Sequence, residues 1–347
     1  MVKTGIVRDE RYLEHETGSY HVENPERLLH IYKALDDLQG FFVEVPPRQA
    51  TQQEVTAVHD PGYVASIAAT AGGPMRHLDP DTVVSPKSYE VALLAAGGLL
   101  AAIDAVMEGL DNASAFIRPP GHHAERNRAM GFCIFNNVAI GARYALSKYG
   151  LERVLIADWD LHHGNGTQRT FYSDPHVLYF STHQYPYYPG TGHYTEIGEG
   201  EGRGFTVNVP LSAGQDDVDY ANIFKHILRP IALAYRPQLI LVSAGFDIYF
   251  QDPLGGMNVT ERGFARLTDI VMDIAQTVCE GKFVITLEGG YNLQGLAGSV
   301  KEVVSVMAGR TTLDKGKWEE KEIKGFPRVQ GIVNTTRRSL QDFWQWE

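Results

Sequence analysis

The chain has only two cysteines among its 347 residues, Cys133 and Cys279, and they lie far apart without a CxxC spacing. This scarcity excludes a disulfide framework and fits a reducing compartment. Basic residues are also few, since 31 lysines and arginines stand against 42 aspartates and glutamates, for a net charge of −11. Direct binding of nucleic acid is therefore not expected. An acidic surface could attract cationic partners, although in many proteins acidity serves solubility alone.

Long hydrophobic runs are absent as well. Residues 1–7 contain no apolar stretch of signal-peptide length. The most apolar segment, residues 91–103, is too short to span a bilayer and is followed by Asp104 and Glu108, so we expect a buried helix there. With 44% hydrophobic and 10% aromatic residues, the chain can build a large core. We expect a soluble, cytoplasmic protein with no membrane partner.

Short apolar runs that end in turn signals alternate with longer amphipathic segments, which predicts strands alternating with helices. The expected strands cover residues 5–7, 114–117, 154–157, 176–181, 204–210, 239–243 and 282–287. The expected helices cover residues 25–35, 87–109, 136–148, 218–235, 261–280 and 295–307. This alternation predicts an α/β protein in which helices cover both faces of a parallel sheet. We expect a single domain over residues 1–347, with catalytic motifs within 27–308 and a loose, charged C-terminal tail, 309–347, against it.

Polar side chains follow four of the expected strands. One strand runs into residues 158–165 (DWDLHHGN), and three others lead to the His122–His123 loop, to Asp247 and to Tyr291. The carboxyl ends of parallel strands meet at one edge of a sheet, where open α/β sheets bind their ligands. These residues are therefore expected to form one site although they lie far apart in the sequence.

The first of these stretches predicts a metal site. Alternate residues of an extended chain share a face, so Asp158, Asp160 and His162 are expected to point the same way. Two carboxylates and an imidazole this close together need a cation among them. Oxygen ligands with one nitrogen suit zinc or a similar first-row metal, and Asp247 is a candidate further ligand. The alternative is an N-cap aspartate, a buried salt bridge and a core histidine.

Two further features suggest acid–base chemistry. A Pro-Pro-Gly turn precedes His122 and His123, which could act as base and acid if their partners differ. Asp158 and Asn165 are natural partners that would fix the tautomers of the two rings. Two glycines before Tyr291 would let its hydroxyl donate to an oxyanion, although a Gly-Gly-Tyr turn is often purely structural.

Together, these motifs resemble those of the zinc-dependent histone deacetylase family, which includes bacterial and archaeal deacetylases, acetylpolyamine amidohydrolases and acetoin-utilisation proteins. The resemblance runs in the family's order from about residue 26 to residue 308. It is carried by RPPGHHA at 118–124, GFCIFNN at 131–137, DWDLHHGNGT at 158–167, Asp247 with DPLGG at 252–256, and LEGGYN at 287–292. It implies an arginase/deacetylase fold, a three-layer structure with a mainly parallel sheet of about eight strands between helices.

The resemblance also implies amide hydrolysis with zinc held by Asp160, His162 and Asp247, while Asp158 becomes a partner of His122. The zinc would polarise the acyl carbonyl and lower the pKa of a bound water. Fe(II) could fill the same site. The implied catalytic residues are His122, His123, Tyr291, Asp158 and Asn165.

The implied substrate contacts form a narrow channel around the stem of acetyl-lysine. The carbonyl of Gly131 would accept from the substrate amide, Phe132 would form one wall, and Tyr188 stands where the family usually has a second phenylalanine. Arg27 resembles the arginine of an inner acetate-release cavity. Family members also bind structural potassium, here implied at Asp158, Asp160, His162, Ser181 and Thr182, and at a second site formed by Phe171, Asp174, Val177 and Phe205.

Two residues discriminate subgroups. Asn165 replaces the aspartate of class I enzymes, so the sequence looks class II-like, and a neutral amide should leave His123 less basic than a carboxylate would. Leu254 stands where polyamine-preferring members carry a glutamate. We therefore expect acyl-lysine in proteins or peptides as the substrate. The alternatives are an acetylpolyamine or similar cationic amide, and a catalytically silent acyl-lysine binder. The tyrosine-rich loop 184–194 could shape substrate choice or a contact between subunits of an oligomer.

Overall fold

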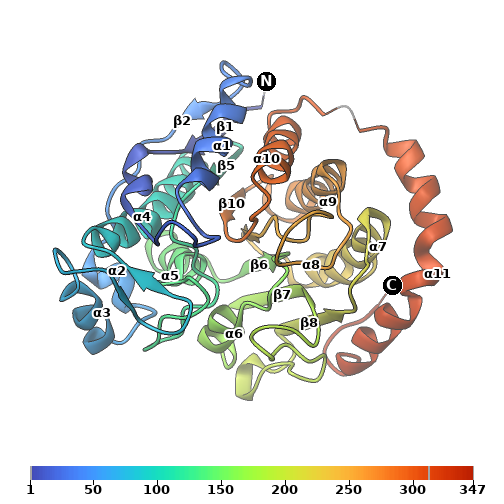
Figure 1. Ribbon diagram of the computed structural model, residues 1–347. Coiled ribbons are helices and arrows are strands. Elements are labelled where there is room, and N and C mark those ends of the chain that lie inside the picture. Colours follow the sequence, from blue (N-terminus) through green and yellow to red (C-terminus); the bar gives the residue numbers. More distant parts are fainter. Residues whose placement is uncertain (1, 312, 347) are drawn as a thin grey trace.

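The computed structural model describes residues 2–311 and 313–346. Its centre is an eight-stranded sheet in which every neighbouring pair is parallel (Figure 1). In spatial order its strands are β2 (Val43–Glu44), β1 (Thr4–Val7), β5 (Asn112–Ala115), β10 (Phe283–Leu287), β9 (Leu239–Ala244), β6 (Val154–Asp158), β7 (Val177–Gln184) and β8 (Thr206–Leu211). A separate antiparallel pair consists of β3 (Arg76–His77) and β4 (Val83–Val84). The predicted parallel sheet of about eight strands is confirmed.

Helices flank the sheet. Helices α4 and α5 pack together; α4 contacts β1, β5 and β10, and α5 contacts β9 and β6. On the other side of the sheet, α1, α10, α9 and α7 pack in a row (Figure 1). The helices are α1 (Glu26–Asp36), α2 (Gln52–Thr56), α3 (Pro61–Ala68), α4 (Ser88–Met107), α5 (Asn137–Tyr149), α6 (Asn165–Phe171), α7 (Asp217–Ile223), α8 (Arg229–Tyr235), α9 (Glu261–Cys279), α10 (Leu293–Met307) and α11 (Lys315–Ser339). Short turns of other helix types are η1 (Glu10–Glu14), η2 (Gly200–Gly202) and η3 (Phe224–Leu228), the last a π turn that joins α7 to α8.

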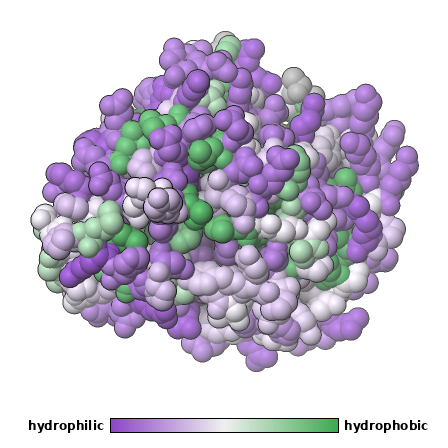
Figure 2. Space-filling model, in the orientation of Figure 1, coloured by the Kyte–Doolittle hydropathy of each residue, from purple (hydrophilic) through white to green (hydrophobic). Residues whose placement is uncertain are grey.

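The core explains why the central strands are apolar throughout rather than alternating. Strands β5, β6, β9 and β10 are buried at every position, because helices cover both of their faces. Helix α4 is the one helix in the described ranges that is long and apolar enough to cross a membrane, but 72% of its most apolar window is buried in the protein. The predicted buried helix is thus part of the core. The outer surface is mainly hydrophilic, with small hydrophobic patches between polar residues (Figure 2).

Several local sequence features explain where helices begin and end. Thr51 and Glu54 form a reciprocal capping box at the start of α2. Gly150 ends α5 in the left-handed conformation, with φ of 64°, which a glycine adopts without strain. Strand β7 extends to Gln184, so the tyrosine-rich loop begins one residue later than expected.

The prediction of a loose C-terminal tail is wrong. Most of this segment forms α11, which packs against α7 and β8 (Figure 1). Glu322 is 2% exposed and accepts hydrogen bonds from Arg266 Nε at 2.7 Å and Lys225 Nζ at 2.8 Å. Val329 and Val333 are fully buried beside it. Few apolar residues of α11 contribute to its packing, so its amphipathic pattern is weak in the sequence. The charges that pair with Glu322 come from distant segments and give no local signal.

One buried histidine leads to a prediction for stability. Burial lowers the pKa of His59 to about 4, although its ring is hydrogen-bonded to the backbone of Glu125 and Asn136. The folded protein therefore keeps His59 neutral at pH values where the unfolded chain, with a pKa near 6.5, takes up a proton. This contribution to stability is complete above about pH 6.5 and is lost as the pH falls through about 4.

We expect the unfolding free energy of the wild type to fall between pH 6 and pH 4.5 more steeply than that of His59→Gln. The difference in slope should be about 1.4 kcal/mol per pH unit, equivalent to one proton, because glutamine keeps a donor and an acceptor but does not titrate. Urea unfolding of the metal-loaded protein at a series of pH values measures this difference. Parallel slopes for the two proteins would show that His59 does not carry the effect.

Candidate active site

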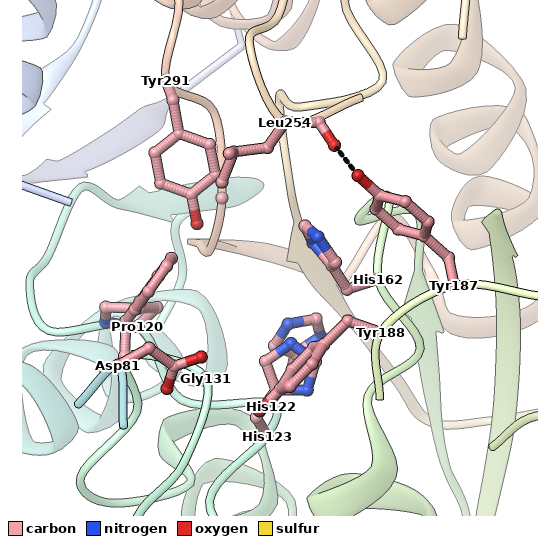
Figure 3. Close-up of a pocket in the computed structure, with 12 residues that line it drawn as sticks. Asp81, Pro120, His122, His123, Gly131, His162, Tyr187, Tyr188, Leu254 and Tyr291 are labelled. Atoms are coloured by element: carbon pink, nitrogen blue, oxygen red, sulfur yellow. Dashed lines mark hydrogen bonds between the residues drawn. The ribbon is translucent and has the colours of Figure 1, made fainter. Parts of the chain in front are cut away.

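The loops after β5, β6, β9 and β10 surround a cavity of about 260 Å³ (Figure 3). The predicted convergence of strand ends is therefore what the structure shows. The cavity is lined by Asp81, Pro120, His122, His123, Gly131, Phe132, His162, Tyr187, Tyr188, Leu254, Gly289 and Tyr291.

The predicted metal ligands meet next to this cavity, which His162 lines. Nδ1 of His162 lies 3.2 Å from Oδ1 of Asp160 and 3.1 Å from Oδ2 of Asp247, and one potential ligand atom from each residue lies within 4.8 Å of the others. All three residues are buried. Strand β6 ends at Asp158, however, so Asp160 and His162 lie in the loop beyond it. The expectation that an extended strand aligns them is wrong, and loop geometry brings them together instead.

Backbone groups hold these carboxylates in place. Oδ2 of Asp160 accepts from the amide of Gly289 at 2.8 Å, and Oδ1 of Asp247 accepts from the amide of Leu161 at 2.9 Å. A Cβ atom on Gly289 would lie 2.3 Å from the Asp247 carboxylate, so the close approach requires glycine.

The charges in this buried space favour a divalent cation. Burial and the nearby Asp160 carboxylate raise the pKa of Asp247 to about 7, and burial raises the pKa of Glu288 to about 7. Burial disfavours the charged form of His162, but hydrogen bonds to Asp160 and Asp247 outweigh it and raise its pKa to about 9. Crowded carboxylates that can ionise only at a cost are stabilised by a metal ion. Two carboxylates and one imidazole match the donors of zinc.

The two adjacent histidines have different partners, as predicted. Nδ1 of His122 lies 3.1 Å from Oδ2 of Asp158, and Nδ1 of His123 lies 2.8 Å from Oδ1 of Asn165. Burial opposes protonation of His122, but Asp160 and Asp158 raise its pKa to about 10. Burial and the two neighbouring imidazoles of His122 and His162 lower the pKa of His123 well below its usual value. The pair is thus divided between a readily protonated and a neutral ring.

Tyr291 directs its hydroxyl into the cavity from the side opposite the two histidines (Figure 3). Its backbone amide donates to Oδ2 of Asp252 at 2.7 Å, and the guanidinium carbon of Arg27 lies 5.0 Å from its ring centre. Burial raises the pKa of Tyr291 well above its usual range, so the hydroxyl stays a proton donor.

Aromatic side chains form the channel walls. The Phe132 ring lies 5.9 Å from that of Tyr291, and the Tyr188 ring lies 5.2 Å from that of His123, both at an interplanar angle of 85°. Gly131 has a positive φ of 56°, and a Cβ there would lie 2.3 Å from the His123 ring. Leu254 lies beside Tyr291 and accepts a hydrogen bond at its carbonyl from the Tyr187 hydroxyl, at 2.9 Å (Figure 3).

Comparison with known protein families matches residues 21–307 to the histone deacetylase domain. The chain belongs to the histone deacetylase family. A crystal structure of the HDA15 HD domain superposes on this deacetylase with a TM-score of 0.86 and 35% identity, covering 99% of both chains. The arginase/deacetylase fold implied by the sequence is confirmed.

Named relatives agree with this assignment. A probable deacetylase of Archaeoglobus fulgidus is 42% identical over 88% of this chain and 86% of its own length. The polyamine deacetylase HDAC10 of Danio rerio is 42% identical over 92% of this chain, and the histone deacetylase HDA1 of Candida albicans is 39% identical over 89%. The alignments span 47% and 41% of those two longer proteins. The similarity supports a hydrolase that acts as a deacetylase.

Two residues of the deacetylase site escaped the sequence reasoning. Asp81 lines the cavity, and Glu288 accepts hydrogen bonds from the amides of Gly121 and His122, at 2.7 and 3.1 Å. Tyr187 also lines the cavity and belongs to the tyrosine-rich loop that the sequence suggested for substrate choice or a subunit contact. The LEGGYN motif contains Glu288, so its position three residues before Tyr291 was the available signal. Asp81 lies in a loop with no strand-end pattern, and its sequence gives no comparable signal.

Arg27 lies behind the site rather than in the cavity. It is fully buried and donates from Nε to the carbonyl of Gly290 at 2.7 Å and from Nη1 to Glu23 at 3.0 Å. Glu23 also pairs with Arg118 at the start of the histidine loop. This buried ion cluster connects the loop of Tyr291 to the loop of His122 and His123.

The two sets of residues implied for potassium differ in their fit. Ser181 pairs with Asp158 across the β6–β7 ladder, and the hydroxyl of buried Thr182 has no hydrogen-bond partner among the described residues, so at least one oxygen of this set is available to a cation. This first set suits a cation. In the second set, formed by Phe171, Asp174, Val177 and Phe205, Arg143 already pairs with the only carboxylate and the carbonyls of Phe171 and Phe205 already accept hydrogen bonds.

Proposed function

We propose that this deacetylase removes acetyl groups from the ε-amine of lysine in proteins or peptides, with zinc held by Asp160, His162 and Asp247. The observation that carries the proposal is the cavity itself. Its aromatic walls lead to three buried side chains that together could hold a metal ion, with two histidines on one side and a tyrosine hydroxyl on the other. A flexible four-carbon stem that ends in a planar amide matches this shape.

Zinc in this position would supply a Lewis acid for the acyl carbonyl and lower the pKa of a water molecule. Three protein ligands leave a coordination position open, as catalytic sites require. An Asp/His/Asp ligand set also suits Fe(II). The ligands therefore fit both metals, and zinc is the one that we propose.

The side chains divide the remaining work. His123, whose Nδ1 faces the neutral amide of Asn165, takes a proton from the attacking water, and His122, whose Nδ1 faces the Asp158 carboxylate, donates one to the departing amine. The Tyr291 hydroxyl donates a hydrogen bond to the carbonyl oxygen of the substrate's acetyl group as negative charge develops on that oxygen. Gly131 lines the cavity, and its carbonyl would accept from the substrate N–H, while Phe132 and Tyr188 would enclose the stem and exclude water.

Two cavity residues bear on the substrate class. Leu254 is apolar and offers nothing to a second ammonium group of a polyamine. Asp81 provides a carboxylate in the cavity, and no lysine or arginine within the described ranges forms a salt bridge with it. It can therefore accept from the backbone amides of a peptide or attract an ammonium group. The second candidate substrate is an acetylpolyamine, because several relatives are named polyamine deacetylases.

Turnover of an acetyl-lysine peptide should be compared with that of acetylputrescine, using kcat/KM for the zinc-loaded protein. We expect the peptide to be preferred, and Leu254→Glu to move the preference toward acetylputrescine by adding a charge that binds the second amine. Faster turnover of acetylputrescine by the wild type would replace the acyl-lysine proposal with the polyamine one. The proposal further includes a structural potassium ion at the first set and a cytoplasmic location.

A further inference from the structure

The two ends of the Asn165 side-chain amide have different neighbours. Hydrogen-bond acceptors surround its nitrogen, and a ring nitrogen of His123 faces its oxygen. Its nitrogen Nδ2 lies 2.7 Å from Oε1 of Glu125, 3.4 Å from Sδ of Met130 and 3.5 Å from the carbonyl oxygen of His123. These three atoms are all hydrogen-bond acceptors. Its oxygen Oδ1 lies 2.8 Å from Nδ1 of His123. Asn165 is 3% exposed, so water does not compete freely for either end.

This environment permits only one orientation of the amide. With the side chain rotated by half a turn, the amide oxygen would face the Glu125 carboxylate at hydrogen-bond distance, with no proton between the two oxygens. An ionised carboxylate accepts but cannot donate, so that contact is repulsive. The charge on Glu125 therefore holds the amide oxygen toward His123.

We propose that Glu125 is a positioning residue that acts through Asn165 to set the tautomer of His123. Because Oδ1 of Asn165 can only accept, Nδ1 of His123 must carry the proton. The other ring nitrogen, Nε2, is then unprotonated and can accept a proton in the cavity. A neutral amide alone cannot enforce this tautomer, since its nitrogen end would select the opposite one. Glu125 thus removes the ambiguity that comes with asparagine in place of aspartate.

The carboxylate of Glu125 is itself well anchored. Its side chain is 14% exposed, and Nε of Arg169 lies 3.1 Å from the same Oε1 that faces Asn165. Its backbone carbonyl accepts from the Nδ1 of His59 at 2.9 Å, and its amide donates to the carbonyl of Arg128 at 2.9 Å. Glu125 is therefore fixed from three directions, which an orienting group requires.

The proposal rests on the assigned role of His123 as a base, but the tautomer can be measured without turnover. Nitrogen-15 NMR of histidine-labelled, zinc-loaded protein distinguishes a protonated from an unprotonated ring nitrogen, and the His123 signals are identified by their loss in His123→Gln. We expect Nδ1 protonated in the wild type and in Glu125→Gln, because Nε of Arg169 donates to the oxygen at this position and keeps it facing Asn165, where it still accepts. Glu125→Ala should show a mixture of tautomers. The Nδ1-protonated form alone in Glu125→Ala would overturn the proposal, whether or not the protein proves to be a deacetylase.

A double-mutant cycle separates positioning from a general structural role. Glu125→Ala should lower kcat on an acetyl-lysine peptide by about tenfold, with KM nearly unchanged. General-base catalysis contributes on the order of a hundredfold or more to the rate, and a base in the wrong tautomer loses much of this contribution. In Asn165→Asp the carboxylate has no wrong orientation, so adding Glu125→Ala should cost no further activity. An equal loss in both backgrounds would overturn the proposal.

Glu54 provides a matched control. Its side chain is 18% exposed and also pairs with an arginine, Arg48, but it caps α2 away from the cavity. Glu54→Ala should lower stability while the His123 tautomer and kcat stay those of the wild type. If the His123 signals shift equally in Glu54→Ala and Glu125→Ala, the change comes from general destabilisation, and the proposed positioning role of Glu125 is refuted.

Discussion

Replacing Tyr291 by phenylalanine is expected to lower turnover of an acetyl-lysine substrate by about a hundredfold or more while zinc stays bound. The hydroxyl points into the cavity and stays protonated, because burial holds its pKa high. A donor aimed at a developing oxyanion contributes to the transition state and little to substrate binding, so kcat should fall and KM should stay nearly the same. Steady-state kinetics together with elemental analysis of the variant measures both parts of this result.

Tyr12→Phe is the appropriate control for the loss of a buried hydroxyl. Tyr12 is fully buried and donates to the carbonyl of Leu94 at 3.1 Å, outside the cavity. It should lose some stability and keep wild-type kcat. Near-normal turnover of Tyr291→Phe would remove this residue from the mechanism and leave the oxyanion without a donor.

Replacing His162 by alanine is expected to abolish both metal binding and activity. The imidazole lies within 3.2 Å of both carboxylates of the cluster, and its loss leaves two acidic ligands that repel each other. Elemental analysis after gel filtration should find less than about a tenth of the zinc bound to the wild type, because two of the three protein ligands cannot hold the ion. His193→Ala removes a histidine outside the cluster and should keep its metal. A His162→Ala protein with a full equivalent of zinc and normal turnover would contradict the assigned ligand set.

The site was predictable because parallel strands bring their carboxyl ends to one edge. Apolar runs marked β6, β9 and β10, and the polar residues just beyond them had to lie at the same side of the sheet. That reasoning placed Asp160, His162 and Asp247 together although about 85 residues separate the last two. The same reasoning brought the His122–His123 loop and Tyr291 to the cavity.

What the sequence could not give depends on loops and on pairings between distant segments. The alternating pattern of a strand suggested the alignment of Asp160 with His162, but the strand ends at Asp158 and a loop does this work. Helix α11 escaped because its burial depends on Glu322 meeting cations from η3 and α9, and not on a strong apolar stripe. Glu125 escaped for a related reason, since its importance lies in which end of the Asn165 amide it faces.

We propose that the buried cluster of Asp160, His162 and Asp247 holds a metal that acts on an acyl-lysine amide. Acetate release from an acetyl-lysine peptide should be measured with zinc-loaded protein, after removal of the metal by a chelator, and after zinc is restored. We predict acetate release by the loaded protein, background levels after chelation, and recovery with one equivalent of zinc. Undiminished acetate release by fully metal-free protein, or none from the zinc-loaded protein on any acyl-lysine peptide, would contradict the account.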